Sequence, residues 1–408
     1  MEYNQDELSS PSWLSNAFFQ HVLSRFENDS TVRLVDTCEL RPGTKAGDHF
    51  ASVMYRTTVR YRVGGDQQTS ALFLKSIDLI MKIKPLQEGL KKELLNDDDF
   101  FGKEIQMYTK VLPEMARLME SIGEEYKYPR LIYAAEKPHT IIILEDISPQ
   151  KWRMKGLLDS FEDLKPTIDA IAKFHAASMM MQQQDPEFKL QFRCTIPDTF
   201  RSMRSMTDAC FHSFVNFLRE DLSLPEFVAP VQSFHQTIDD RIRAAYATSE
   251  TCANVLIHGD FHFKNLLHLE SEDRVVNTMF VDYQMCSWSS QTVDLFYLTY
   301  MIPTQSVKTH HRDEIVYRYH QKFTDLLRSL NFSGYIPSLN ALQLGMLSNG
   351  QLELFHYIVF SAFRYIDLSK VDSEAFFQGK IANPALQIEE FREAMRKELK
   401  RFLHQGVL

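Results

Sequence analysis

One stretch of the chain limits the possible folds more than any other, because apolar runs and polar residues alternate in it at fixed intervals. Its first part, Ile257–Asn265, has the sequence IHGDFHFKN, and its second part, Phe280–Gln284, has the sequence FVDYQ. Two further apolar runs lie between these parts, split by a short polar stretch. A hairpin over this interval would bring Asp282 back beside Asp260 and Asn265. Two carboxylates and an amide would then share one loop, where oxygen ligands suit Mg²⁺ and a free carboxylate can accept a proton.

The rest of the pattern predicts an α+β chain whose two parts differ in secondary structure. Strands are expected over 31–40, 50–63, 69–77, 130–135 and 140–145, with the Gly64-Gly65 pair as a hairpin signal. Helices are expected over 13–26, 101–119, 160–179, 200–220, 227–247, 313–330, 351–365 and 388–403. We therefore expect a β-rich N-terminal lobe with one long inserted helix over 1–145, and a larger, mainly helical lobe over 146–408.

Composition argues against several classes of protein. A length of 408 residues exceeds what one hydrophobic core usually organises. The net charge of −9 argues against a broad nucleic-acid or anionic-membrane surface. Five scattered cysteines lack the spacing of a disulfide framework or a zinc site. The start lacks the basic-then-apolar order of a signal peptide, and no apolar run reaches membrane-spanning length, so we expect a cytoplasmic protein without membrane insertion.

The pattern His-Gly-Asp-x4-Asn, followed by Asp-Tyr-Gln, resembles the catalytic loop and metal aspartate of small-molecule kinases of the aminoglycoside phosphotransferase and choline kinase group, which are related to protein kinases. Within that group, residues 47–56 (GDHFASVMYR) and 142–147 (IILEDI) are similar to the CHK-like, ecdysteroid 22-kinase-like family. The likeness extends in order over nearly the whole chain. It implies a bilobal protein-kinase-like fold, ATP and Mg²⁺ as cofactors, and a small-molecule alcohol as substrate.

The resemblance assigns roles to residues of the loop. Asp260 would orient the attacking hydroxyl or accept its proton, and Asn265 and Asp282 would hold the metal ion. The alternative for each aspartate is an ordinary turn residue. His262 occupies the position of a phosphate-contacting lysine in protein kinases. His175, on an apolar helix face, is better explained as a core histidine.

The resemblance also assigns roles in the first lobe. Lys75 would grip the phosphates and pair with Glu104, because a lysine in an apolar strand is costly to leave unpaired. The alternatives are a lysine that extends to solvent from an edge strand and a glutamate on a solvated helix face. Gly47 and Ser52 would approach the phosphates, unless their segment is an ordinary hairpin loop.

Two further positions follow from the resemblance. Glu145 and Ile147 belong to the connector that would offer backbone groups to adenine, although Glu145 is equally well explained as a cap. Asp294 resembles the buried aspartate that ties the catalytic loop to the next helix, which is a supporting role.

These features predict an ATP- and Mg²⁺-dependent kinase that phosphorylates a hydroxyl of a small, lipophilic alcohol, such as an ecdysteroid or another steroid-like or xenobiotic alcohol. The alternative is a catalytically silent kinase-like protein that binds a ligand or serves as a scaffold. A protein kinase fits less well, because Asp294 follows Asp282 after only twelve positions, too few for a long activation segment. We expect no nucleic-acid partner, and the sequence does not specify the oligomeric state.

Overall fold

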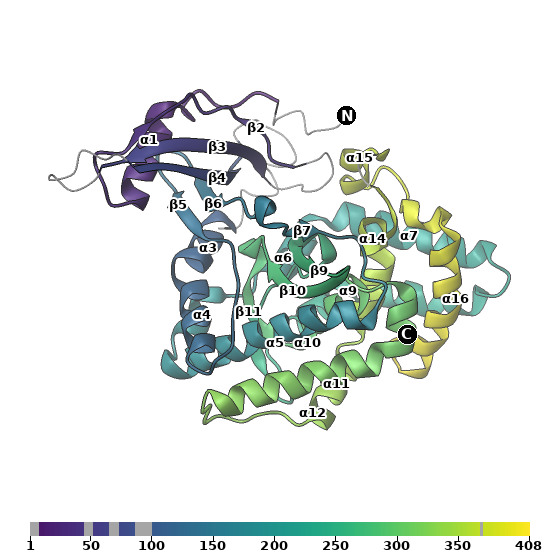
Figure 1. The fold of residues 1–408 in the computed structure, drawn as a ribbon. Coiled ribbons are helices and arrows are strands. Elements are labelled where there is room, and N and C mark those ends of the chain that lie inside the picture. The colour runs from purple at the N-terminus through teal and green to yellow at the C-terminus, as the bar shows by residue number, and fades with distance from the viewer. Residues whose placement is uncertain (1–7, 45–51, 65–72, 86–99, 368–369) are drawn as a thin grey trace. The chain divides into compact units, whose positions relative to one another are not determined.

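The computed structural model describes residues 8–44, 52–64, 73–85, 100–367 and 370–408 (Figure 1). Two compact units make up the chain. The first comprises Met1–Pro113 and Lys127–Arg153, and the second comprises Glu114–Tyr126 and Met154–Leu408. The expected domain boundary after Glu145 remains a prediction, whereas the compact units divide after Arg153.

An antiparallel sheet forms the first unit. Its described strands are β1 (Arg33–Leu34), β2 (Arg41–Pro42), β3 (Val53–Val63), β4 (Phe73–Ile83), β5 (Leu131–Ala135) and β6 (Ile141–Glu145). They lie in the order β1-β3-β4-β6-β5, and β2 pairs with β3. Apolar side chains at odd-numbered positions of β3 and β4 pack with α1 (Asn16–Phe26) in one buried cluster. Because successive side chains of a strand point to opposite faces, even-numbered residues of β4 face away from this cluster.

The strands and helix of the first unit differ in part from expectation. Strand β4 continues to Ile83, although it was expected to end at residue 77, because Leu79, Met81 and Ile83 extend the buried alternation. The strand expected over 31–40 is reduced to β1. The helix expected over 101–119 is present as α3 (Phe100–Gln106), a π-helical turn (Met107–Val111) and α4 (Leu112–Glu120), which enters the second unit.

Helices dominate the second unit, together with short strands. Its α-helices are α5 (Phe161–Gln184), α6 (Ile196–Ser202), α7 (Arg204–Glu220), α8 (Val228–Gln236), α9 (Ile238–Ala245), α10 (Thr292–Tyr300), α11 (Gln305–Ser329), α12 (Leu339–Ser348), α13 (Gln351–Phe355), α14 (Ser361–Tyr365), α15 (Ser373–Phe377) and α16 (Glu389–His404), and a π-helical turn, η8 (His356–Phe360), joins α13 to α14. Its strands are β8 (Asn254–Ile257), β9 (Leu266–Ser271), β10 (Arg274–Phe280) and β11 (Ser287–Ser290), with β7 (Arg153–Met154) beside β9.

Two helices form the centre of the second unit. Helix α5 contacts α11 and the strands β8 and β10. Every residue of α10 is buried. The expected α+β fold class, with an antiparallel sheet in the N-terminal part and a larger helical part, is confirmed. No helix within the described part of the chain is long and apolar enough to cross a bilayer.

Candidate active site

Gly259 forms the bend by which the chain leaves strand β8. Its φ is +80°, a conformation that residues with a Cβ atom rarely adopt. A Cβ atom at this position would lie 2.5 Å from the backbone oxygen of Met285 and 2.9 Å from Cδ1 of Ile196. Only glycine therefore fits between the strand and the loop that carries Asp260.

The side chain of Asp294, on helix α10, stabilises the same bend. Its side chain is fully buried and accepts hydrogen bonds from the backbone N–H groups of His258, at 2.7 Å, and Gly259, at 3.1 Å. Nε2 of His175 lies 3.0 Å from Oδ2 of Asp294, and Nδ1 of His175 lies 2.8 Å from the Tyr319 hydroxyl. Asp294 thus ties the loop to the following helix, as predicted, and His175 is a buried histidine with hydrogen-bond partners.

Asp260 and Asn265 face each other across the loop. The amide nitrogen of Asn265 donates to the backbone oxygen of Asp260, at 2.9 Å, and to its Oδ2, at 3.0 Å. These two bonds fix which end of the amide is nitrogen, so the Asn265 oxygen is the atom left to bind a cation. An interval of five residues has therefore brought a carboxylate and an amide oxygen to one place.

His262 lies on the other side of the Asp260 carboxylate. Its Nε2 is 3.3 Å from Asp260 Oδ1, and its Nδ1 accepts a hydrogen bond from the backbone N–H of Lys264. A neutral ring with this acceptor carries its hydrogen on Nε2, where it can donate to Asp260. Burial would raise the pKa of Asp260, but His262, with His258 and the amide of Asn265, lowers it to about 2. Asp260 is therefore ionised at neutral pH.

The β9–β10 hairpin returns the chain to this loop. The two strands pair from Leu266 opposite Phe280, and the Val281 N–H donates to the backbone oxygen of Asn265 at 3.0 Å. Nε2 of the buried His258 donates to the Val281 oxygen at 3.1 Å. The predicted hairpin is confirmed, and it places the backbone of Asp282 one residue beyond a direct contact with Asn265.

Asp282 has a left-handed backbone, with φ 65° and ψ 60°. This conformation is uncommon for residues other than glycine and occurs often at functional sites. Nε2 of Gln284 lies 3.4 Å from Asp282 Oδ2. The side chains of Asn265 and Asp282 both offer oxygen donors, a chemistry that suits Mg²⁺ rather than a soft metal.

The lysine–glutamate pair of the first unit differs from the prediction. Lys75, expected to bind Glu104, instead binds Glu27 at 2.7 Å, and its side chain is 46% exposed. Glu104 on α3 binds Lys82 at 2.5 Å, with exposed fractions of 3% and 9%. The correction follows from strand geometry: the two lysines are seven positions apart on β4, so they point to opposite faces of the sheet.

Sequence reasoning missed Lys82 because it ended the strand too early. The run LIMKI over 79–83 surrounds this lysine with apolar residues as closely as the run around Lys75 does. Extending the strand to Ile83 would have made Lys82 a second candidate, on the face of the strand opposite to Lys75.

Further predicted positions lie at the ends of the first unit's strands. Ser52 is buried immediately before β3, and Gly47 lies outside the described residues. The Glu145 carboxylate at the end of β6 accepts from Arg130 and Gln150, at 2.9 Å and 3.0 Å. Both donors are side chains rather than backbone N–H groups at a helix start, so these bonds do not make Glu145 a cap, and the use of its backbone stays a prediction.

The order of these parts defines a class of protein. A sheet that carries a buried lysine–glutamate pair, then an Asp-x4-Asn loop and a further aspartate after a hairpin, is typical of kinase-like phosphotransferases. The chain belongs to the ecdysteroid kinase-like family, whose model matches residues 46–332.

Solved structures similar to the chain come from the same broad class. A macrolide 2'-phosphotransferase from Brachybacterium faecium has 12% identity and a TM-score of 0.36, covering 87% of this chain and 96% of its own. The GDP complex of aminoglycoside 2'-phosphotransferase-IIIa has 12% identity and a TM-score of 0.40, with 93% and 99% covered. An aminoglycoside phosphotransferase from Alicyclobacillus acidocaldarius has 12% identity and a TM-score of 0.34, with 85% and 90% covered. No curated protein matches the sequence significantly.

Proposed function

We propose that the protein is an ATP- and Mg²⁺-dependent phosphotransferase that transfers the γ-phosphoryl group to a hydroxyl of a small, lipophilic alcohol. Membership of the ecdysteroid kinase-like family supports a small-molecule kinase. The observation that carries the proposal is the geometry of Asp260, held by Asn265 on one side and His262 on the other. Phosphoryl transfer depends mainly on positioning and charge stabilisation, which this arrangement can supply.

Asp260 would receive the substrate hydroxyl. Its side chain is 31% exposed, so one carboxylate oxygen can still accept a hydrogen bond from an alcohol. A pKa near 2 makes it a weak base, so its main effect would be to orient the hydroxyl. Its proton transfer would come late, once the hydroxyl has become acidic through bond formation to phosphorus.

Asn265 and Asp282 would hold Mg²⁺ through side-chain oxygens. The bound ion would neutralise charge on the phosphate oxygens. Two hydrogen bonds hold the backbone of Val281, the residue before Asp282, against the loop. Its N–H donates to the Asn265 backbone oxygen, and its carbonyl accepts from the His258 side chain. A loop and hairpin held in this way would reduce the entropy cost of binding the ion and the nucleotide.

Lys82 replaces Lys75 in the proposal as the lysine that contacts the phosphates, and Glu104 would orient it. An ion pair between a strand lysine and a helix glutamate is the arrangement that positions such a lysine in kinases. The backbones of Glu145 and Ile147 would contact adenine, and Gly47, Ser52 and His262 would lie near the phosphates. These assignments rest on the family rather than on a contact in the structure.

For the substrate class, an ecdysteroid or another steroid-like or xenobiotic alcohol is proposed from the family alone. The test is transfer of labelled phosphate from ATP to a panel of steroid, amine and glycoside alcohols, with and without Mg²⁺. Asp260→Asn should keep ATP binding and lose turnover, whereas Asp282→Asn should lose Mg²⁺-dependent ATP binding. Asp260→Asn with wild-type turnover would refute the role of Asp260. ATP binding without transfer to any alcohol would favour a silent ligand-binding protein.

A further inference from the structure

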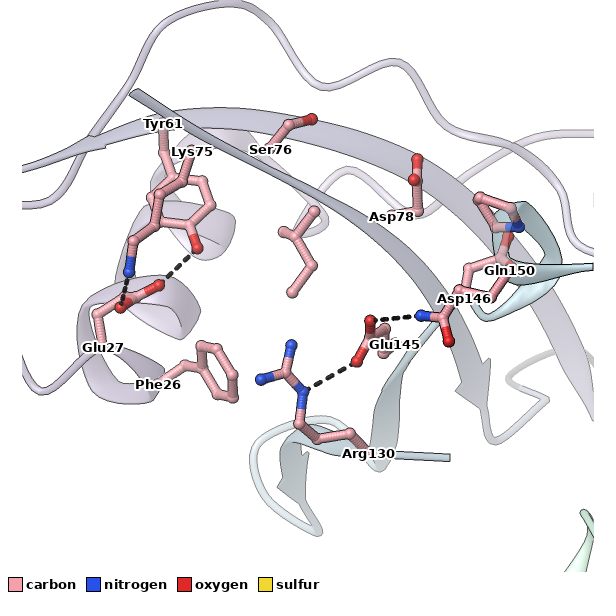
Figure 2. Close-up of a pocket in the computed structure, with 12 residues that line it drawn as sticks. Phe26, Glu27, Tyr61, Lys75, Ser76, Asp78, Arg130, Glu145, Asp146 and Gln150 are labelled. Atoms are coloured by element: carbon pink, nitrogen blue, oxygen red, sulfur yellow. Dashed lines mark hydrogen bonds and ion pairs between the residues drawn. The ribbon is translucent and has the colours of Figure 1, made fainter. Parts of the chain in front are cut away.

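A hollow lies in the first unit, on the face of the sheet opposite to the side chain of Lys82. Its volume is about 540 Å³, within the range of small-molecule sites. Tyr61 and Ile77 contribute to its wall from the sheet face that packs on α1, and Phe26 contributes from the end of that helix. Figure 2 shows Lys75 on one side of this hollow and Arg130 on the other, with the Phe26 ring between them.

Carboxylates that line the hollow already accept hydrogen bonds through nearly all their oxygens. Glu27 accepts from the Tyr61 hydroxyl at 2.6 Å and from Lys75 at 2.7 Å, one bond to each oxygen. The two oxygens of Glu145 accept from Gln150 and from Nε of Arg130. These four oxygens therefore have little need of a ligand that donates.

The two aspartates in the wall are engaged in the same way. Asp146 accepts from Arg56 at 2.6 Å through one oxygen and from the Ser148 N–H at 2.9 Å through the other. Asp78 is an even-numbered residue of β4, so its carboxylate, which accepts from the Thr58 hydroxyl through Oδ1, points to the opposite face of the sheet.

By contrast, several N–H donors in the wall have no acceptor among the described residues. Arg130 uses Nε only, so neither terminal nitrogen of its guanidinium has an acceptor among the described residues, and Lys75 uses one of its three N–H groups. Strand β6 pairs with β4 only from Leu79 onward, and on that side the backbone oxygen of Asp78 accepts from the backbone N–H of Asp146. The backbone of Ser76, two residues earlier, points to the same open edge. The hollow therefore offers more unused donors than unused acceptors, which favours a ligand that accepts hydrogen bonds.

Charge decides which acceptor fits best. On this face of the sheet the positive charges of Lys75 and Arg130 balance the negative charges of Glu27 and Glu145, and the adjacent Arg56–Asp146 ion pair adds no net charge. A monoanion adds one uncompensated negative charge to this balance, whereas a phosphate dianion adds two. Phe26, whose ring centroid lies 5.0 Å from Cζ of Arg130, and the 7% exposed Ile77 give the apolar surface next to the donors, which suits a ligand with an apolar body.

We propose that this hollow binds the carboxylate of a small monoanionic organic acid. The two terminal nitrogens of Arg130 would take the two carboxylate oxygens in a fork, which is the geometry that guanidinium favours. Lys75 would supply a second charged donor from the opposite side, and the apolar body of the acid would lie over Phe26 and Ile77. The proposal is independent of the phosphotransferase function.

Benzoate is the probe for this site, and the methyl group of Ile77 is the reporter. Protein labelled with ¹³C at isoleucine methyl groups is titrated with sodium benzoate, and the Ile77 signal is assigned by Ile77→Val. Saturable shifts of this signal are expected with a Kd on the order of 1 mM, reasonable for so small a ligand. Inorganic phosphate and the cationic analogue benzamidine are titrated in parallel and should bind more weakly.

Matched variants separate the site from general charge effects. Arg130→Gln should weaken benzoate binding at least about tenfold, because a forked, charge-assisted contact is lost. Arg60→Gln is the control: Arg60 is 61% exposed and pairs with Asp36 rather than with the wall of the hollow, so binding should persist. Unchanged methyl spectra in the absence of ligand show that each variant is folded.

Three results would overturn the proposal. The first is the absence of a saturable Ile77 shift at benzoate concentrations up to about 50 mM, far above the expected Kd. The second is tighter binding of phosphate or benzamidine, which would contradict the monoanion assignment. The third is equal binding to folded Arg130→Gln and wild type.

Discussion

Replacement of Lys82 by methionine tests the corrected lysine assignment and can be given a magnitude. The Lys82–Glu104 pair is almost completely buried, with exposed fractions of 9% and 3%. Methionine keeps much of the side-chain volume but removes the positive charge. Loss of one partner from a buried ion pair costs about 3–5 kcal/mol, because the remaining charge stays in a poorly solvated place. We expect Lys82→Met to lower the free energy of unfolding by this amount and to abolish phosphoryl transfer.

Lys75→Met is the matched control on the same strand. The Lys75–Glu27 pair is 2.7 Å long but partly exposed, at 46% and 15%. Such pairs contribute roughly 0–1 kcal/mol, so this variant should unfold close to wild type. Turnover should also stay near wild type, because Lys75 lies on the face of β4 opposite to Lys82.

A double variant separates stability from catalysis. Lys82→Met combined with Glu104→Leu leaves no charge of this pair in the protein, and replacement of a buried pair by apolar residues is often neutral or stabilising. Urea unfolding should therefore show most of the lost stability restored, whereas phosphorylation of a substrate found in the alcohol panel should stay absent. Equal effects of Lys75→Met and Lys82→Met, or full activity in the double variant, would refute the reasoning.

Three other perturbations have defined outcomes. In urea unfolding, Gly259→Ala should lower the free energy of unfolding by about 2–4 kcal/mol, since it adds a 2.5 Å contact to an unfavourable φ. Gly123 has a similar φ of +74°, but a Cβ atom there would meet no atom within 4 Å, so Gly123→Ala should cost only about 1 kcal/mol. Asp294→Asn should cost about 2–4 kcal/mol, because an amide cannot accept from both loop N–H groups. Burial lowers the pKa of His268 from 6.5 to about 4, so between these two pH values His268 is protonated in the unfolded chain and neutral in the folded chain. This group's stability contribution should be complete above about pH 6.5 and fall by about 2 kcal/mol at pH 5, a decrease that His268→Gln should remove.

The opposite outcome of any of these three experiments would contradict the structural argument. Equal losses in the two glycine variants would show that the contact with Met285 is relieved at no cost. An Asp294→Asn protein as stable as wild type would mean that the loop does not need its buried acceptor. Identical pH profiles of wild type and His268→Gln between pH 7 and pH 5 would contradict the lowered pKa of His268.

The parts predictable from sequence are those fixed by short separations along the chain. Gly259 and a five-residue interval were enough to place Asn265 against Asp260, and two apolar runs around a polar turn were enough for the hairpin that returns Asp282. Such contacts depend on local turn geometry, which residue types largely determine. The role of Asp294, by contrast, was predicted from the family resemblance.

The choice between two lysines could not be made with the strand ended at residue 77. Lys75 and Lys82 both lie among apolar residues, and an odd separation places them on opposite faces of β4. Which face meets Glu104 depends on the packing of α1 against the other side of the sheet, a contact between distant segments. Periodicity indicates that faces alternate but does not say which partner covers each one.

The hold of Asp294 on the loop also bears on motion. The amides of His258 and Gly259 both donate to a carboxylate that is 0% exposed on a fully buried helix. Deuterium from solvent should therefore reach these two amides only through cooperative opening of the core, which makes their exchange among the slowest in the second unit. The segment that bears Asp260 is thus a fixed platform, and any adjustment to alcohols of different shape has to come from elements around it.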